Sequence, residues 1–121
     1  MALNRALRLR KRSEFQRVRQ QGRSLTSRLL ILAWVPSAEE NEIARARVGF
    51  VVSKRISKLA VERNYIKRLL SEAVRHVLPE LPGGWDIVLS ARNAVMSADL
   101  HTLEQDIVTL LQRANLLERE H

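Results

Sequence analysis

Six cationic side chains lie between residues 54 and 68, in a segment where a strand-like run is followed by a helix-like one. Lysine ammonium groups bind phosphates as point charges, and arginine guanidinium groups can hold a phosphate or a purine edge through two hydrogen bonds. An asparagine among them can both donate and accept. This chemistry fits recognition of a nucleic acid. The residues concerned are Lys54, Arg55, Lys58, Arg63, Asn64, Lys67 and Arg68.

The distribution of charge supports the same interpretation. The 121 residues carry 21 Lys and Arg against 13 Asp and Glu, for a formal net charge of +8. Segments 1–28 and 48–78 carry net charges of +8 and +5, whereas 29–47 and 79–121 carry −1 and −4. Basic charge gathered in two segments is typical of a protein that binds a polyanion, either a nucleic acid or an anionic membrane.

Several other classes of protein lack the residues they need here. The chain has no cysteine and three scattered histidines, which excludes a disulfide framework, a thiolate zinc site and cysteine-based catalysis. Its longest apolar run, 29–35, is far shorter than the roughly 20 residues that cross a bilayer. The basic amino-terminus resembles no secretory signal. We expect one cytoplasmic domain over 1–121, frayed at about 1–6 and 117–121.

A helix is predicted to carry most of the basic cluster. Apolar residues between 58 and 78 recur at helical spacing, so they gather in one arc of the helix. That arc holds Ile66, Leu69, Leu70, Ala73 and Val77, and the opposite arc holds Asn64, Arg68, Ser71 and Arg75. Because uncompensated like charge destabilises a surface helix, this pattern favours a binding role.

A shorter helix is predicted near the amino-terminus, over about 14–21. Ser13 and Gln16 form a capping-box pattern at its start, and Gly22 is suited to end it. Its apolar face is thin, so Phe15 must dock on a larger element for the helix to persist.

The remaining pattern predicts strands over 29–35, 47–53 and 85–91, and a last helix over about 99–116, capped by Ser97 or Asp99. We expect a hairpin between the first two strands and a split βαβ unit around the central helix. The result is a small α+β domain with its helices on one side of the sheet. Asp86 has no second acid or base at a suitable spacing, so we interpret it as a strand-start residue.

The motif in the basic helix is specific enough to indicate a family. Ala60, Arg63-Asn64, Ile66 and Lys67-Arg68 resemble the signature of the bacterial ribonuclease P protein subunit. The run 48–55 resembles the central strand of that family, 86–92 resembles its last strand, and Phe15 stands where the family has an aromatic residue. The likeness covers about 10–115.

The resemblance implies a fold and an activity. The fold is an α+β, two-layer αβββαβα sandwich, similar to certain ribosomal protein domains, with an unusual left-handed βαβ crossover where general topology rules favour a right-handed one. The activity is endonucleolytic removal of the 5′ leader of precursor tRNA. The ribonuclease P RNA and its Mg²⁺ carry out the chemistry, so the protein itself has no catalytic side chain, cofactor or metal. No membrane and no obligate protein partner are expected.

The resemblance also implies two binding surfaces. The helix and the loop before it contact the catalytic RNA through Lys54, Arg55, Lys58, Arg63, Asn64, Lys67 and Arg68. A cleft between the sheet and the first helix holds the single-stranded leader through Phe15, Arg19, Phe50, Val52 and Arg92. An aromatic platform with flanking cations accepts many sequences.

Three positions depart from the family pattern. Ser71 replaces a further basic residue, whose backbone contact is either missing or taken over by Arg75, and Arg19 replaces a second aromatic residue. Trp34 lies near a position that is often Tyr, and strand alternation points it to the other face.

Two other classes of function explain part of the sequence. A stand-alone RNA-binding module, such as a ribosomal protein, would have the charge without the signature over 60–68. A membrane-surface protein would use the basic helix, but its apolar arc would then face lipid and leave the sheet uncovered.

Overall fold

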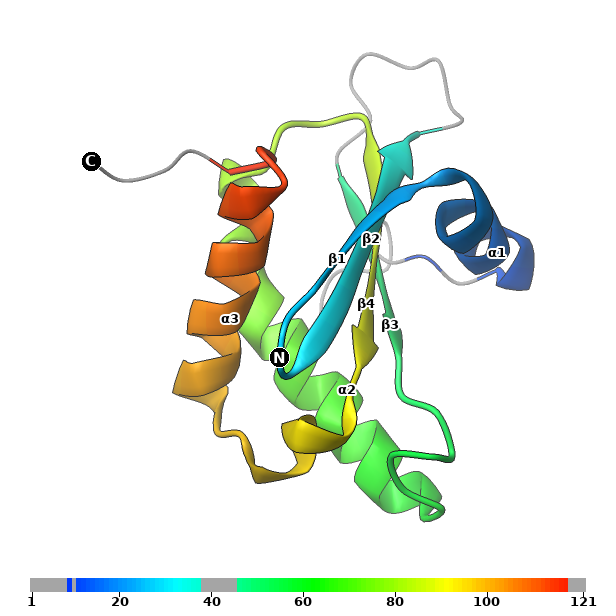
Figure 1. Ribbon diagram of the computed structural model, residues 1–121, viewed down its shortest axis with the longest axis vertical. Helices are drawn as coiled ribbons and strands as arrows, with labels where there is room; N and C mark the ends of the chain where they lie inside the picture. Colours follow the sequence, from blue (N-terminus) through cyan, green and yellow to red (C-terminus); the bar gives the residue numbers. More distant parts are fainter. Residues whose placement is uncertain (1–8, 10, 38–45, 118–121) are drawn as a thin grey trace.

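The computed structural model describes residues 9, 11–37 and 46–117. These residues form a four-stranded sheet, three α-helices and two short 3-10 helices (Figure 1). In chain order the elements are α1 (Arg12–Gln21), β1 (Arg23–Thr26), β2 (Leu30–Pro36), β3 (Arg47–Val51), α2 (Ala60–Arg75), η2 (Leu78–Glu80), β4 (Trp85–Ala91), η3 (Asn93–Ser97) and α3 (Leu100–Arg113). The α+β class and the αβββαβα order are confirmed.

The sheet is mixed, with strand order β1-β2-β4-β3. Strands β1 and β2, and likewise β2 and β4, pair antiparallel, whereas β3 and β4 are parallel neighbours joined through α2. In Figure 1 β1 is the edge nearest the viewer, β3 and β4 run downward behind it, and α2 rises from below the strands to their left side. The β3–α2–β4 crossover is therefore left-handed, as the family resemblance implied.

The strand pairing corrects two expectations. The hairpin partner of β2 is β1, a strand that the apolar pattern did not reveal because its residues Arg23–Thr26 are mostly polar and exposed. Strand β4 lies between β2 and β3, so the predicted hairpin between segments 29–35 and 47–53 is wrong. Because β3 and β4 are direct neighbours, the βαβ unit is not split.

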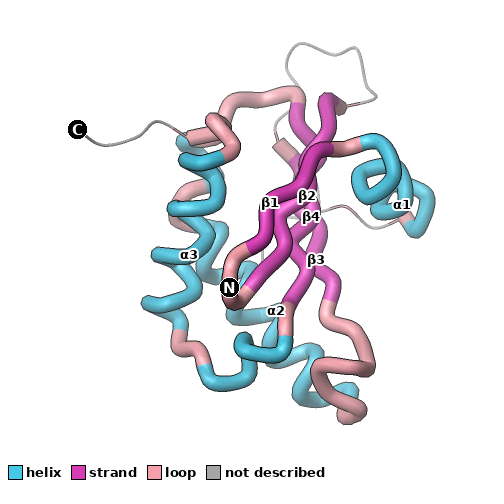
Figure 2. Tube along the Cα trace, in the orientation of Figure 1, coloured by secondary structure: helices cyan, strands magenta, loops and turns pink. Residues whose placement is uncertain are grey.

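The helices cover both faces of the sheet, not one. Helices α2 and α3 pack on one face and bury the larger core, whereas α1 lies alone on the opposite face (Figure 2). Strand alternation explains the two cores, because Leu30, Leu32, Ile87 and Leu89 point to one face and Ala33, Val35 and Val88 to the other. The smaller residues on the second face let α1 approach the sheet.

The ends of α1 show why this helix fits so closely. It begins earlier than predicted, and Glu14, not Ser13, satisfies its start, because the Glu14 carboxylate accepts the Lys11 backbone N–H at 2.9 Å. Gly22 ends the helix as predicted. A Cβ on Gly22 would lie within 2.5 Å of the Trp34 carbonyl oxygen and closer still to that of Val18. Only glycine therefore permits the direct passage from α1 into β1.

An ionic cluster holds α1 on the sheet. The Asp86 side chain at the start of β4 is 2 % exposed, and its two oxygens accept from Nε and Nη2 of Arg47 in β3, both at 3.1 Å. Arg17 of α1 contributes its Nη1 at 3.3 Å and also donates to the Pro36 carbonyl oxygen. Arg47 in turn pairs with Glu14 at 2.7 Å. One buried carboxylate thus joins α1, β3 and β4.

Helix α2 buries most of its predicted face, including Ile66, Leu70 and Ala73, with Leu69 half-buried; the helix ends at Arg75, and Val77 is buried just beyond it. Ser71 was expected on the outer arc, but it is 6 % exposed, so a long basic side chain would not fit there without rearrangement. Arg75 pairs with Glu72 at 3.2 Å.

Helix α3 is capped by Asp99, which accepts the Thr102 N–H at 2.8 Å. That hydrogen bond holds the pKa of Asp99 below its ordinary value. Leu117, expected to fray, donates its N–H to the Leu111 carbonyl at 3.3 Å. The expected fraying at 1–6 and 118–121 lies outside the described residues.

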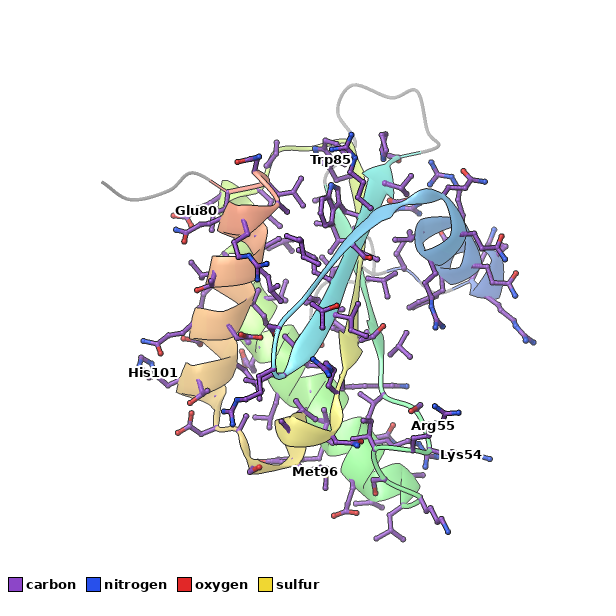
Figure 3. The ribbon with its side chains drawn as sticks, viewed as in Figure 1. Lys54, Arg55, Glu80, Trp85, Met96 and His101 are labelled. Carbon is purple, nitrogen blue, oxygen red and sulfur yellow. The ribbon has the colours of Figure 1, made fainter. Side chains whose placement is uncertain are left out.

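The ionic cluster leads to a stability prediction. Asp86→Ala leaves two arginines without their shared carboxylate and should lower the free energy of unfolding by about 3 kcal/mol, the lower end of the usual range because both arginines are partly exposed. Asp86→Asn should cost less, since it keeps the shape and one acceptor. The control is Glu80→Ala, an exposed carboxylate in η2 (Figure 3), which should change stability by less than about 0.5 kcal/mol. Urea unfolding measures all three, and equal values for Asp86→Ala and Glu80→Ala would contradict the assigned role of the cluster.

Candidate nucleic-acid interface

The loop between β3 and α2 presents three of the predicted cations. Lys54 and Arg55 occupy an exposed turn at the carboxyl end of β3, next to the start of α2 (Figure 3), and Lys58 is exposed just before the helix. The turn is closed by the Ile56 N–H, which donates to the Ser53 carbonyl at 3.0 Å, and the Ile56 side chain packs against the larger core. The charged ends are therefore carried on an anchored loop.

Ser57 connects this loop to the first turns of α2. Its hydroxyl donates to the Glu62 carboxylate at 2.6 Å and accepts the Leu59 N–H at 3.2 Å. The Arg63 guanidinium donates through Nη1 to the Ser57 carbonyl at 2.9 Å and is only half-exposed. Arg63 was expected to contact the catalytic RNA, and in the structure its side chain also braces the loop.

Three further predicted residues of α2 are exposed. Asn64, Lys67 and Arg68 stand three and four positions apart, so they share one side of the helix. Among the residues that the structure describes, none of the three forms an ion pair or a side-chain hydrogen bond. We call these three residues and the three exposed cations of the preceding loop the basic face. Its members are Lys54, Arg55, Lys58, Asn64, Lys67 and Arg68. The face ends at Arg68, because Arg75 is paired with Glu72.

Phe15 lies on the other side of the sheet, between α1 and β3. A Cβ on Gly49 would fall 2.5 Å from Cε1 and 2.6 Å from Cζ of the Phe15 ring, so the ring rests directly on the glycine backbone. Val51 packs in the same cluster. Phe15 is half-buried and Arg19, one turn further along α1, is exposed. The sequence prediction that both could face a ligand is compatible with these positions.

The structure does not bring Phe50 and Val52 to Phe15. Both residues pack against the core under α2 and α3, on the opposite face of the sheet, and Trp34 does the same. Alternation along β3 is the reason, because Gly49 and Val51 point toward α1 and the residues between and after them point away. These two members of the expected cleft are therefore corrected: they are core residues.

A row of side chains beside α1 shares the sheet face on which Phe15 lies. The register aligns Thr26, Ile31, Ser90 and Val51 across all four strands, on the face that α1 covers only in part. Ile31 is 37 % exposed, Thr26 is exposed, and Ser90 and Val51 are half-exposed. We call these four residues the open row. Sequence reasoning missed the row because it depends on strand register, which no local pattern specifies.

Arg92 lies at the end of β4, level with the basic loop that follows its parallel neighbour β3. Its backbone N–H donates to the Leu29 carbonyl at 2.8 Å, and its Nη1 donates to the Ser27 carbonyl at 2.6 Å. The Ser27 hydroxyl in turn contacts Asp106 at 2.5 Å. Arg92 is thus exposed but oriented by the β1–β2 turn, beyond the open row and away from Phe15.

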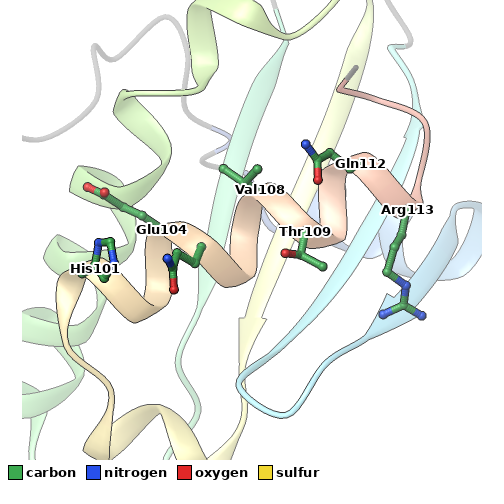
Figure 4. A pocket seen from close by; sticks show the side chains of 7 residues that line it. His101, Glu104, Val108, Thr109, Gln112 and Arg113 are labelled. Carbon is green, nitrogen blue, oxygen red and sulfur yellow. The ribbon is translucent and has the colours of Figure 1, made fainter. Parts of the chain in front are cut away.

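A separate hollow lies on the outer side of α3 (Figure 4). The described side chains that line it all come from this one helix: His101, Glu104, Gln105, Val108, Thr109, Gln112 and Arg113. The Oε1 atom of Glu104 also lies 3.0 Å from Nδ1 of His76. Over the described ranges there is no group of three or more His, Cys, Asp or Glu that could hold a metal ion, and no helix long and apolar enough to cross a membrane.

Comparison with known sequences identifies relatives across nearly the whole chain. The family model described as Ribonuclease P matches residues 3–115. The ribonuclease P protein component of Chloroflexus aurantiacus is 44 % identical over 116 residues, which cover 95 % of this chain and 82 % of the relative. That of Caldanaerobacter subterraneus is 38 % identical over 112 residues, covering 93 % and 92 %.

Solved structures agree with the sequence comparison. The Staphylococcus aureus RNase P protein superposes with a TM-score of 0.79 at 26 % identity, covering 93 % of this chain and 98 % of that one. The Thermotoga maritima RNase P protein gives a TM-score of 0.75 at 27 % identity, covering 88 % and 96 %. Signature, fold and relatives therefore agree, and the chain belongs to the bacterial ribonuclease P protein family.

Proposed function

We propose that this chain is the RNA-binding subunit of a ribonuclease P, in which a catalytic RNA and its Mg²⁺ remove the 5′ leader of precursor tRNA in the cytoplasm. The observation that carries the proposal is the basic face. It displays the family signature residues Asn64, Lys67 and Arg68 as exposed side chains, without partners among the described residues. Family membership supplies the identity of the RNA.

The basic face suits a folded RNA. Its cations repel one another in the free protein, and RNA phosphates relieve that repulsion while releasing condensed counterions. Since Arg63 and Ser57 brace the loop against α2, the cations are arranged before the RNA arrives. Preorganisation of this kind reduces the entropy lost on binding.

Phe15 and the open row suit a single strand. An aromatic ring stacks on any base, and the neutral residues of the row offer little that would select one sequence. Arg19 on α1 and Arg92 at the end of β4 flank this surface and can meet backbone phosphates. We assign the 5′ leader to it, with Phe15, Arg19 and Arg92 retained from the expected set and the open row in place of Phe50 and Val52.

The side chains of both surfaces bind ligands and are not required to transfer protons. They are ammonium, guanidinium, amide, hydroxyl and hydrocarbon groups. Their contribution to cleavage is to neutralise RNA phosphate charge and to position the leader, which lowers the Mg²⁺ concentration that the RNA partner needs.

The direct test is cleavage of precursor tRNA by a bacterial ribonuclease P RNA at low Mg²⁺. Addition of the wild-type protein should stimulate cleavage strongly. The Arg68→Ala variant should lose most of the stimulation, whereas Arg113→Ala, which removes an exposed cation from α3, should retain it. Absence of stimulation by the wild-type chain at every salt concentration would reduce it to a general RNA binder.

Binding to the catalytic RNA alone tests the basic face. Lys67→Ala and Arg68→Ala should each weaken binding and reduce the slope of log K against log salt by about one, because each removes one phosphate contact. Helix content by circular dichroism should stay constant for both, since neither side chain packs in the core. Arg63→Ala should in addition lower the melting temperature, because it releases the Ser57 carbonyl. An unchanged slope for Arg68→Ala would remove that residue from the interface.

The leader surface is tested by comparing two ligands. Phe15→Ala should weaken binding of precursor tRNA with a long leader to the holoenzyme by about 5- to 100-fold, and should leave binding of leaderless tRNA nearly unchanged. Arg68→Ala is the reciprocal control, with equal losses for both ligands. Equal losses for Phe15→Ala would show that the ring acts only by packing on Gly49.

A further inference from the structure

The amino-terminal part of α2 carries an unusual apolar surface. This part of the helix projects beyond the end of the sheet (Figure 1), and the first buried residue of α2 is Ile66. Before it, Leu59, Val61 and Tyr65 are 63 %, 80 % and 57 % exposed. They make up half of the six large hydrophobic side chains exposed among the described residues, so the exposure is concentrated in one place.

Tyr65 lies at the edge of the basic face, next to Arg68. Val61 is four positions before it and Arg68 three positions after it, which places these three side chains in one row along the helix. Asn64 directly precedes Tyr65 in the chain, whereas Lys67, two positions after it, lies on another side of the helix. In the part of the chain that the structure describes, the Tyr65 hydroxyl has no hydrogen-bond partner and its ring no aromatic partner.

The surrounding charge indicates what would cover the ring. A second copy of this chain would bring Lys58, Lys67 and Arg68 against the same cations, and like charges at an interface are unfavourable. An RNA offers phosphates for the cations and a base for the ring. The base must be unpaired. In an A-form helix the faces of the bases are stacked on each other, so an aromatic side chain cannot stack on them.

We propose that Tyr65 is a stacking residue that receives an unpaired base of the catalytic RNA, while Arg68, three positions after it in the same row, holds an adjacent phosphate. The assignment rests on the proposed function and adds to it a residue that is neither charged nor part of the signature. Stacking contributes attraction that does not depend on counterion release. Tyr65 therefore supplies binding that persists at salt concentrations where the cations contribute less.

The test measures affinity for a bacterial ribonuclease P RNA over a series of KCl concentrations. Tyr65→Ala should weaken binding by about 5- to 100-fold at every concentration, with the salt slope unchanged. Tyr65→Phe keeps the ring and should bind within about twofold of the wild type. The matched control is Val61→Ala, which removes exposed apolar surface from the same row without removing a ring, and it too should remain within about twofold.

Other outcomes would overturn the assignment. Equal affinity of Tyr65→Ala and wild type would exclude stacking, and so would an equal loss in Tyr65→Phe, because the hydroxyl would then carry the contact. Sedimentation of the free protein addresses self-association: a dimer that Tyr65→Ala dissociates, with RNA affinity unchanged, would make the row a contact between copies. Failure of the wild-type chain to bind the RNA would overturn the proposed function itself, an outcome distinguishable from a defect confined to Tyr65.

Discussion

The buried carboxylate of Asp86 is the constraint on which the binding surfaces depend. A charge removed from water must be paired, and here the pairing partners come from two different elements, Arg47 of β3 and Arg17 of α1. These ion pairs fix the position at which α1 crosses the sheet. Because the helix is held at the start of β3 and β4, Phe15 comes to rest on Gly49, and the next row of the sheet is left uncovered.

Strand β3 then links the two surfaces. Gly49 supports the Phe15 ring, and Val51 belongs to the open row. Lys54 and Arg55 follow within a few residues at the start of the basic face. The alternate residues of the same strand, Val48 and Phe50, are anchored in the core beneath α2 and α3. Strand β3, which is packed on both faces, therefore sets the distance between two surfaces. One surface suits single-stranded RNA, and the other suits a folded RNA. Rigid spacing of this kind is useful when two parts of one RNA complex must be held together.

The stable core also explains why α2 can carry uncompensated charge. From Ile66 onward one side of the helix is buried against the sheet and α3, so its stability comes from packing rather than from its surface pairs. The other side need not contribute to the core and presents Lys67 and Arg68, and the turn before Ile66 presents Tyr65. The hydrogen bond from Arg63 to Ser57 uses a backbone carbonyl and leaves the charge of the arginine in place.

Much of the fold was predictable from local patterns. Helical spacing predicted α2 and the burial of Ile66 and Leu70, and the signature over 60–68 predicted the family and the exposure of Asn64, Lys67 and Arg68. These features depend on residues close in sequence, and the sequence by itself determined them. Only the tertiary structure decided the face that α1 covers, the edge strand β1, the register of the open row, the paired state of Asp86 and the inward direction of Phe50 and Val52. Each of these depends on which strands pair and in what register, and such contacts join residues far apart in the chain.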